Sequence, residues 1–171
     1  MLELKDATLS LGGRQLLKGL SVMAMKGQMT CVTGSPGCGK SALLRVLMGF
    51  IPLDSGMVSV DGELISELSA DAFRRMMAYV PQETVAQPSP FVPDTDDLET
   101  AWSGERLPRH ILRALTPPMV EIHDKPIVLL DEPPVAMVRQ VRVLADEGRT
   151  VVVATRRTEF LDVADKIIKL E

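Results

Sequence analysis

The stretch that decides the fold is Met29-Thr-Cys-Val-Thr-Gly-Ser-Pro-Gly-Cys-Gly-Lys-Ser41. A short apolar run from Met29 to Thr33 leads directly into a glycine-rich segment, Gly34 to Ser41, which fits the pattern G-x-x-x-x-G-K-S. A chain of this length and of average composition matches that pattern by chance at a rate of about one per cent or less. A helical run, Ser41 to Phe50, follows. This strand–loop–helix context predicts a phosphate-binding loop rather than an incidental glycine-rich turn beside an exposed lysine.

Each residue type in this loop has a physical reason to be there. The glycines let the backbone curl so that its N–H groups face phosphate oxygens, and the start of the following helix adds partial positive charge. Lys40 would place a cation on the β- and γ-phosphates, and the Ser41 hydroxyl would reach Mg²⁺. The residues expected to hold the nucleotide, most plainly Mg-ATP, are Gly34, Ser35, Pro36, Gly37, Cys38, Gly39, Lys40, Ser41 and Ala42.

An acidic pair supplies the second half of the predicted site. The apolar run Ile127 to Leu130 ends in Asp131-Glu132 and suits a strand buried on both faces of a parallel sheet. In a sheet that carries a phosphate loop, Asp131 would lie near the metal and Glu132 would face the γ-phosphate, where it could polarise a water molecule. The alternative interpretation is a solvated strand end or a helix N-cap.

The flanking sequence alternates strand and helix patterns, which predicts an α/β fold with a mostly parallel sheet. A β hairpin is expected at the start, from Leu2 to Leu11 and back from Leu16 to Met25, around the turn residues Gly12-Gly13. Further strands are expected at Gly56 to Gly62, Met77 to Val80, Thr150 to Thr155 and Lys166 to Leu170, and helices at Ser69 to Met77, Gly104 to Leu115, Val135 to Glu147 and Phe160 to Ala164.

Composition narrows the class of protein. The 171 residues suit one domain, and a formal net charge of −4 argues against a wide basic face, so no nucleic-acid partner is expected. The two cysteines, Cys31 and Cys38, cannot form a disulfide framework and fit a reducing compartment. Neither a signal peptide nor an apolar run of membrane-spanning length is evident. We therefore expect a cytoplasmic protein without direct membrane insertion, which would work at a membrane only through a partner.

Several segments together resemble the ATP-binding subunit of ABC transporters. In chain order these segments are Leu17-Lys-Gly-Leu20, Lys26-Gly27, Gly34 to Ser41, Ser55-Gly56, Asp61-Gly62, Tyr79-Val-Pro-Gln82 and Leu129-Leu-Asp-Glu-Pro133. The resemblance covers most of the chain and is most specific from Met1 to Gln82. It implies a P-loop NTPase fold with the antiparallel hairpin added at the N-terminus.

The resemblance also implies roles and partners. Gln82 resembles the glutamine that contacts Mg²⁺ and the attacking water, so the implied metal-linked residues are Ser41, Gln82 and Asp131. The implied catalytic residues are Lys40, Gln82 and Glu132, with Glu132 as general base. The family pairs on binding ATP and docks on a membrane permease, so a homodimer and a permease subunit are the expected partners.

The chain also departs from the family pattern. The adenine-stacking aromatic residue falls nearest to Leu11, and the signature sequence L-S-G-G-E is eroded to Ala101-Trp-Ser-Gly-Glu105, where Trp102 would crowd the phosphate. No aspartate occurs in Pro134 to Val138, where the family has one, and the switch histidine is replaced by Arg156. Arginine can pair with a γ-phosphate but is not a neutral imidazole.

The largest departure is in length. Residues 83–102 form a short, proline-rich and acidic stretch where the family has a helical subdomain, so we expect a single nucleotide-binding domain over residues 1–171 with that subdomain much reduced.

Three hypotheses remain open at this stage. The first is an ATP-hydrolysing subunit of an ABC-type transport system. The second is a nucleotide-binding module with little or no turnover that acts as a regulatory or interaction protein. The third, a small-molecule kinase, lacks an evident arginine-rich lid, and the sequence fixes neither the transported substrate nor ATP over GTP.

Overall fold

The computed structural model describes residues 1–82, 122 and 124–171. Its strands are β1 (Leu2–Leu11), β2 (Arg14–Ala24), β3 (Gln28–Gly34), β4 (Ser55–Val60), β5 (Glu63–Leu64), β6 (Met77–Val80), β7 (Ile127–Asp131), β8 (Thr150–Ala154) and β9 (Lys166–Leu170). Its helices are α1 (Lys40–Leu47), α2 (Ala70–Arg75), α6 (Val138–Asp146) and α7 (Thr158–Leu161), with a 3-10 turn, η1 (Val135–Met137), before α6.

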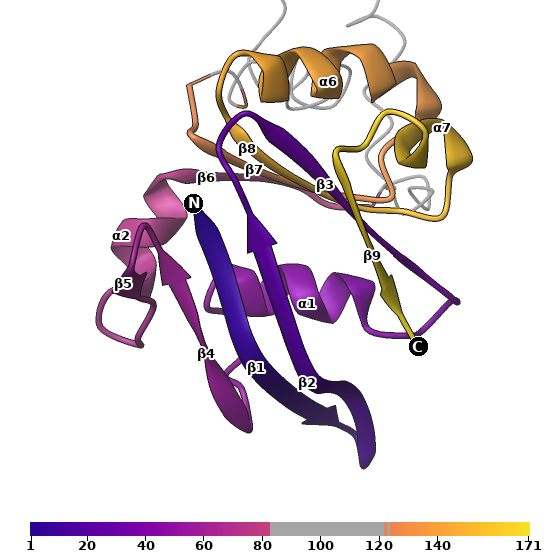
Figure 1. Ribbon diagram of the computed structural model, residues 1–171. Coiled ribbons are helices and arrows are strands. Elements are labelled where there is room, and N and C mark those ends of the chain that lie inside the picture. The colour runs from indigo at the N-terminus through magenta and orange to yellow at the C-terminus, as the bar shows by residue number, and fades with distance from the viewer. Residues whose placement is uncertain (83–121, 123) are drawn as a thin grey trace, which may run out of the picture.

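The strands form two sheets (Figure 1). The first is antiparallel, with four strands in the order β2-β1-β4-β5, and the second has five strands in the order β6-β7-β8-β3-β9. Every strand pair recorded in the second sheet is parallel. The predicted parallel sheet is thus confirmed, whereas the predicted N-terminal hairpin is only part of an antiparallel sheet that β4 and β5 extend.

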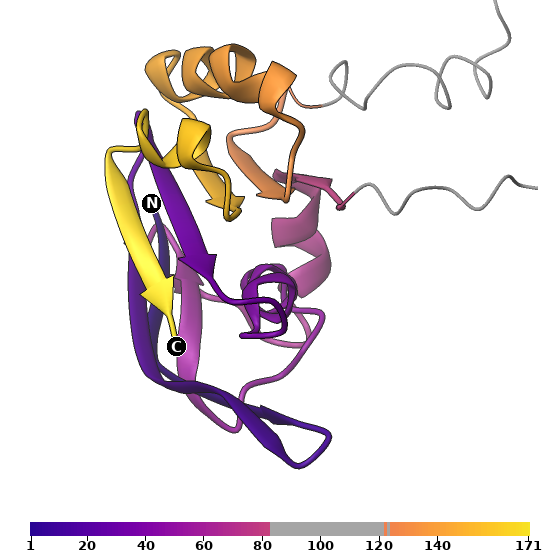
Figure 2. The same ribbon diagram turned by 90° about the vertical axis from the view of Figure 1, so that its right-hand side faces the viewer.

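Alternate residues of the parallel strands face two separate cores. On β7 and β8, Leu129 and Val152 pack with residues of α1 and of the antiparallel sheet. The residues between them, Val128 and Leu130 on β7 and Val151 and Val153 on β8, pack with α6 and with Phe160 of α7. Helix α1 therefore lies between the two sheets, and α6 and α7 cover the other face of the parallel sheet (Figures 1 and 2). This uniform burial explains the unbroken apolar runs in the sequence.

Most predicted elements are present with small changes in their bounds. The hairpin turns at Gly12-Gly13, where φ is 58° and 76°, which is the left-handed conformation that such a turn requires. The helix expected from Val135 to Glu147 is divided, because Pro134 is extended (φ −65°, ψ 148°) and the chain makes one 3-10 turn before α6. Strand β5 was not predicted, and the helix expected from Gly104 to Leu115 lies outside the described residues.

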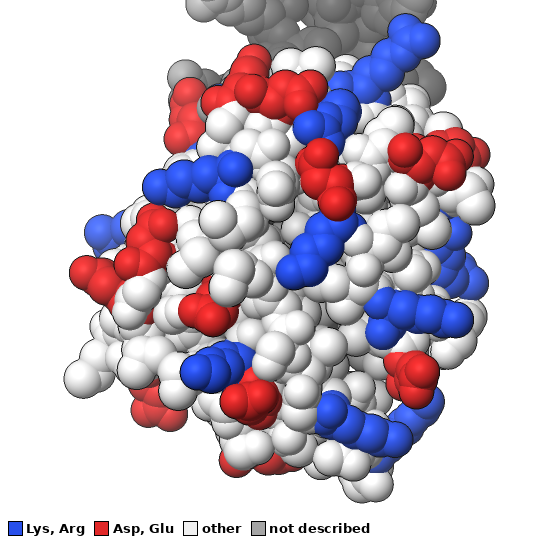
Figure 3. All heavy atoms as spheres, in the orientation of Figure 1, with Lys and Arg blue, Asp and Glu red and all other residues white. Residues whose placement is uncertain are grey.

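Two properties of the described residues bear on the expected location and partners: the apolar character of the helices and the distribution of charge on the surface. Among the described residues, no helix has the length and apolar character needed to cross a membrane. On the face drawn in Figure 3, lysine and arginine side chains alternate with aspartate and glutamate side chains. That face offers no continuous electropositive area of the kind that tracks a phosphate backbone.

Candidate nucleotide-binding site

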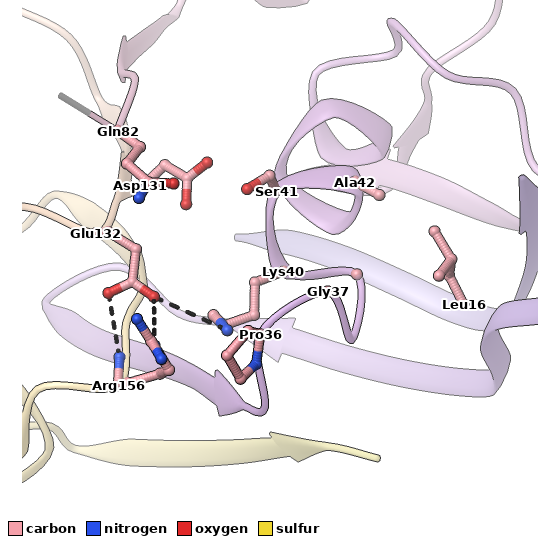
Figure 4. A pocket seen from close by; sticks show the side chains of 11 residues that line it. Leu16, Pro36, Gly37, Lys40, Ser41, Ala42, Gln82, Asp131, Glu132 and Arg156 are labelled. Atoms are coloured by element: carbon pink, nitrogen blue, oxygen red, sulfur yellow. Dashed lines mark hydrogen bonds and ion pairs between the residues drawn. The ribbon is translucent and has the colours of Figure 1, made fainter. Parts of the chain in front are cut away.

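The carboxyl edge of the parallel sheet brings the predicted site residues together. The phosphate loop follows β3, Gln82 follows β6, Asp131 ends β7, and Arg156 follows β8. In parallel α/β sheets this edge is where ligands bind. A pocket of about 350 Å³ opens here, lined by Leu16, Pro36, Gly37, Gly39, Lys40, Ser41, Ala42, Gln82, Asp131, Glu132 and Arg156 (Figure 4).

The loop between β3 and α1 adopts a conformation that depends on its glycines. Gly37 and Gly39 have φ of 74° and 103°, in the left-handed region that glycine enters without strain. Gly39 is the N-cap residue of α1, so the first turn of that helix points its free N–H groups into the pocket.

Lys40 is buried and folded over its own loop. Its Nζ donates hydrogen bonds to the carbonyl oxygens of Gly34 (2.9 Å) and Ser35 (3.2 Å) and lies 3.8 Å from Glu132 Oε1. The side chain is only 8% exposed. A cation held in this way by two carbonyl oxygens lies beside the helix N-terminus, where phosphate oxygens would meet both sources of positive charge.

Three of the predicted loop residues do not line the pocket. Ser35 is exposed, Gly34 contributes its carbonyl oxygen to Lys40, and Cys38 is buried beneath the loop with Sγ 4.0 Å from Lys40 Nζ. A Cβ added at Gly34 would lie 2.6 Å from Cys38 Sγ and 2.6 Å from the Leu170 carbonyl oxygen. Gly34 and Cys38 therefore support the loop from below, while Pro36 to Ala42 supply most of its pocket-facing surface.

A group of oxygen ligands faces Ser41 across the pocket. Asp131 is 3% exposed, and its Oδ1 has no hydrogen-bond partner among the described residues. Figure 4 shows Ser41 and Asp131 pointing toward each other, with Gln82 beside Asp131. The described residues contain no cluster of three or more His, Cys, Asp or Glu side chains. One carboxylate with hydroxyl and amide oxygens fits Mg²⁺, which is usually held by one or two carboxylates together with substrate phosphates and water.

Tyr79 stands behind Asp131 on the neighbouring strand. In the pairing of β6 with β7, Tyr79 is level with Leu129, two residues before Asp131 and on the same face of the sheet. Burial raises the pKa of the Tyr79 hydroxyl, and the negative charge of Asp131 raises it further, while Arg45 opposes the shift. The protonated Tyr79 hydroxyl is neutral, so it adds no second negative charge beside the Asp131 carboxylate.

Glu132 points away from Asp131. Its backbone has φ of 45°, which is unusual for a residue other than glycine, and its N–H donates to the Ala154 carbonyl oxygen at 2.7 Å. Its carboxylate accepts hydrogen bonds at Oε2 from Thr155 Oγ1 (3.2 Å) and from the Arg156 backbone N–H (3.3 Å). Arg156 Nε lies 3.5 Å from Oε1. The two adjacent carboxylates thus face different parts of the pocket, Asp131 toward Ser41 and Glu132 toward Lys40 and Arg156 (Figure 4).

Two residues of this region were missed at the sequence level. Leu16 lines the pocket, whereas Leu11, the position aligned with the family's adenine-stacking aromatic residue, is 42% exposed at the end of β1 and does not line it. Thr155 holds Glu132 through its hydroxyl. No motif marks either residue, although both follow from the hairpin register and from the end of β8.

The eroded signature segment, Ala101 to Glu105, lies outside the described residues, as does the shortened stretch from 83 to 102. The described part of the chain therefore carries the phosphate and metal side of the site, and the expectations about the signature stay predictions.

Comparison with known sequences agrees with this geometry. The sequence pattern of a family described as ABC transporter matches residues 17–115. The chain is 31% identical over 193 aligned residues to the aliphatic sulfonates import ATP-binding protein SsuB 2 of Agrobacterium fabrum, with 93% of this chain and 71% of that protein covered. It is 39% identical over 72 residues to ABC transporter B family member 24, mitochondrial, of Arabidopsis thaliana, an alignment that spans 42% of this chain but only 11% of that protein.

Comparison with solved structures agrees on the fold. One of them, an ATP-binding cassette described as dimeric, in a post-hydrolysis state and bound to ADP and Pi, superposes with a TM-score of 0.71. It is 20% identical and covers 100% of this chain and 94% of that chain. The two-sheet architecture with a phosphate loop after β3 is thus the P-loop NTPase fold found in such cassettes. The family match and the similarity to the Agrobacterium protein over 93% of the chain together show that this chain belongs to the ABC transporter family, in its ATP-binding part.

Proposed function

We propose that this chain binds Mg-ATP in the pocket at the carboxyl edge of its parallel sheet and hydrolyses it as the ATP-binding subunit of an ABC-type transport system. The observation that carries the proposal is the convergence of Lys40, Ser41, Gln82, Asp131 and Glu132 on one pocket of about 350 Å³, although they come from three separate segments of the chain.

The binding step is assigned to the loop and the helix behind it. The backbone from Gly34 to Ala42 and the N-terminus of α1 would surround the phosphates, and Lys40 would exchange its two carbonyl contacts for the β- and γ-phosphates. Leu16 and Ala42 offer apolar contact on the side of the pocket away from Asp131 and Glu132 (Figure 4). An aliphatic wall lacks the stacking that an aromatic ring gives a base, so we expect weak discrimination between ATP and GTP.

The metal and the reaction are assigned to the acidic pair and its neighbours. Ser41, Gln82 and Asp131 would hold Mg²⁺, which when bound neutralises charge on the β- and γ-phosphates. The orphaned Oδ1 of Asp131 supports this assignment, since a buried carboxylate oxygen without a partner is costly unless a ligand satisfies it. Glu132 would accept a proton from the attacking water, which Gln82 would orient.

Family membership supports a proposal about the partner and the location. We propose that the chain acts at the cytoplasmic face of a membrane through a permease subunit, and that it pairs with a second cassette when ATP binds. The alignment with the Agrobacterium protein runs over 193 residues although this chain has 171, so the relative contains segments that have no counterpart here. We propose that the missing segments belong to the helical subdomain, which would be reduced at 83–102 within a single domain over residues 1–171.

The test is steady-state ATP hydrolysis by the purified chain with Mg²⁺. We expect measurable turnover in the wild type and a loss of about 100-fold or more in Glu132→Gln, because the general base is removed. Lys40→Ala should lose turnover through weaker nucleotide binding. Equal rates for the wild type and Glu132→Gln would contradict the hydrolytic mechanism.

A second candidate function is nucleotide binding with little or no turnover. The observation that favours it is the position of Glu132, whose carboxylate is engaged by Thr155, Arg156 and Lys40 and is not directed at Ser41. Light scattering of Glu132→Gln with Mg-ATP separates the two candidates. A nucleotide-driven dimer supports the hydrolytic subunit, and a persistent monomer that still binds Mg-ATP supports the binding module.

A further inference from the structure

Arg156 and Glu132 form a pair of contacts in which both carboxylate oxygens are engaged. Arg156 Nε lies 3.5 Å from Oε1, and the Arg156 backbone N–H donates to Oε2 at 3.3 Å. Thr155 Oγ1 donates to the same Oε2 at 3.2 Å. The dashed lines in Figure 4 show Glu132 turned toward Arg156 and Lys40. The carboxylate is therefore held by the segment that follows β8.

The sheet register fixes this arrangement. Asp131 of β7 pairs with Ala154 of β8, and the next residue, Glu132, donates its N–H to the Ala154 carbonyl oxygen at 2.7 Å. The left-handed backbone of Glu132, with φ of 45°, turns the side chain toward Thr155 and Arg156. The contact thus arises from two neighbouring strands of the core and not from a chance meeting of surface side chains.

The pair also separates two cavities. Gln82, Glu132 and Arg156 line the nucleotide pocket, and the same three residues line a second cavity of about 280 Å³ together with Pro134 and Arg157. Glu132 is 14% exposed and Arg156 is 56% exposed, so the guanidinium can change partners at the pocket mouth while the carboxylate stays enclosed. The arginine is thus the more exposed member of the pair.

We propose that Arg156 is a positioning residue: its guanidinium helps to hold Oε1 of Glu132 toward the segment after β8, and the γ-phosphate of a bound triphosphate frees this oxygen by taking over the guanidinium. This inference rests on the proposed function. A guanidinium binds phosphate and carboxylate groups with the same two-pronged geometry, so the exchange replaces one anion with another at little change in charge pairing. ADP has no γ-phosphate to offer and leaves the pair intact.

The exchange makes Glu132 and the γ-phosphate competitors for one arginine. A ligand shifts such an equilibrium only by its difference in affinity between the two arrangements, and the coupling is reciprocal. Without the Glu132 carboxylate, the Arg156 guanidinium is available to the γ-phosphate. Removing that carboxylate should therefore favour triphosphate over diphosphate binding most strongly when Arg156 is present. Direct repulsion between Glu132 and the γ-phosphate acts with or without Arg156, so it cannot produce that dependence.

The test is a double-mutant cycle on equilibrium binding. Isothermal titration calorimetry with Mg²⁺ gives dissociation constants for ADP and for the non-hydrolysable analogue AMP-PNP in the wild type, Glu132→Gln, Arg156→Gln and the double variant, at concentrations where light scattering finds monomer. Glu132→Gln should raise the preference for AMP-PNP over ADP, measured as the ratio of the two dissociation constants. We expect this increase to be about threefold or more larger in the wild-type background than in the Arg156→Gln background. Arg156→Lys should keep part of this difference, since it retains a cation.

The matched control is Arg157→Gln, which removes the adjacent arginine that lines only the second cavity. It should leave the effect of Glu132→Gln unchanged. If Glu132→Gln has an equal or smaller effect when Arg156 is present, the positioning role is wrong while the proposed function stands. If the wild type binds neither nucleotide, the proposed function and this inference both fail.

Discussion

Asp131 carries the clearest sign of an unmet ligand at the scale of single residues. Its Oδ1 is buried and has no hydrogen-bond partner among the described residues. A charged oxygen in that position lowers the free energy of unfolding, and the protein recovers this cost only when a cation binds. Function and stability are therefore opposed at this residue.

This opposition yields a prediction for Asp131→Asn. Without nucleotide, the variant should be at least as stable as the wild type, with a free energy of unfolding higher by up to about 1 kcal/mol. The reason is that burying an uncharged amide costs less free energy than burying a carboxylate. With Mg-ATP at about 100 times its dissociation constant, the wild type should gain about 2.7 kcal/mol and the variant far less. Urea unfolding with and without Mg-ATP measures both quantities. A variant less stable than the wild type without ligand would contradict this account of Asp131.

Sequence reasoning reached those site residues that a motif marks. Lys40, Ser41 and Asp131 follow from the loop pattern and from an apolar strand that ends in acids, and the structure brings them to one pocket. Leu16 and Thr155 were missed because no sequence motif distinguishes this leucine in a hairpin or this threonine after a strand. The direction of Glu132 could not be predicted either, because it depends on one left-handed φ and on the register of two distant strands.

At the scale of elements, the sequence predicted best those strands whose ends are marked by residues that interrupt the apolar pattern. Strands β6 and β9 begin and end where expected, because the chain on either side breaks the apolar pattern. The two-residue strand β5 has too little sequence to show alternation. It exists because it pairs with the end of β4, which is a tertiary effect that overrides weak local preference.

The junction of β3, α6 and β9 depends on one carboxylate. Asp165 Oδ2 accepts hydrogen bonds from the Met29 backbone N–H (2.8 Å) and from Arg142 Nη1 (2.6 Å). The Met29 N–H and then the Arg142 guanidinium lower the pKa of Asp165 below its ordinary value of 3.8. A carboxyl group with a depressed pKa in the folded chain stabilises the fold above its unfolded pKa and loses that contribution as pH falls through its folded pKa.

We therefore predict that Asp165→Asn lowers the free energy of unfolding at pH 7 by about 1 kcal/mol, a value already reduced for partial solvent exposure. The difference from the wild type should shrink as pH falls below 3.8 and Asp165 itself becomes protonated. Urea unfolding from pH 7 down to pH 3 measures this. Asp162→Asn, in the exposed turn nearby, is the control and should show neither effect, and a pH-independent difference for Asp165→Asn would contradict the account.

At the scale of the whole molecule, one core joins the two sheets. Leu44 of α1 is fully buried in the cluster that contains Leu4 and Val58 of the antiparallel sheet together with Leu129 and Val152 of the parallel sheet. Elements that share a core in this way unfold as one cooperative unit. The phosphate loop is thus anchored between a helix and a strand that the whole core supports.

The shared core predicts the behaviour of Leu44→Ala. The free energy of unfolding should fall by about 2–5 kcal/mol, as for other fully buried leucines, and unfolding should stay a single transition. Hydrogen exchange should therefore accelerate together in β1 and β8. Val143→Ala, which truncates a side chain that is 49% exposed on α6, is the control and should change stability little. Loss of protection in only one sheet would show that the two sheets unfold independently.

The central claim concerns the phosphate loop, Gly34 to Ser41, and its lysine. The most direct measurement is a calorimetric titration of the chain with Mg-ATP, in the wild type and in Lys40→Ala. The account predicts saturable binding with one nucleotide per chain and an affinity at least about tenfold lower in Lys40→Ala, since a charge-assisted contact to two phosphates is lost. Equal affinities in the two proteins, or no binding by the wild type, would contradict it.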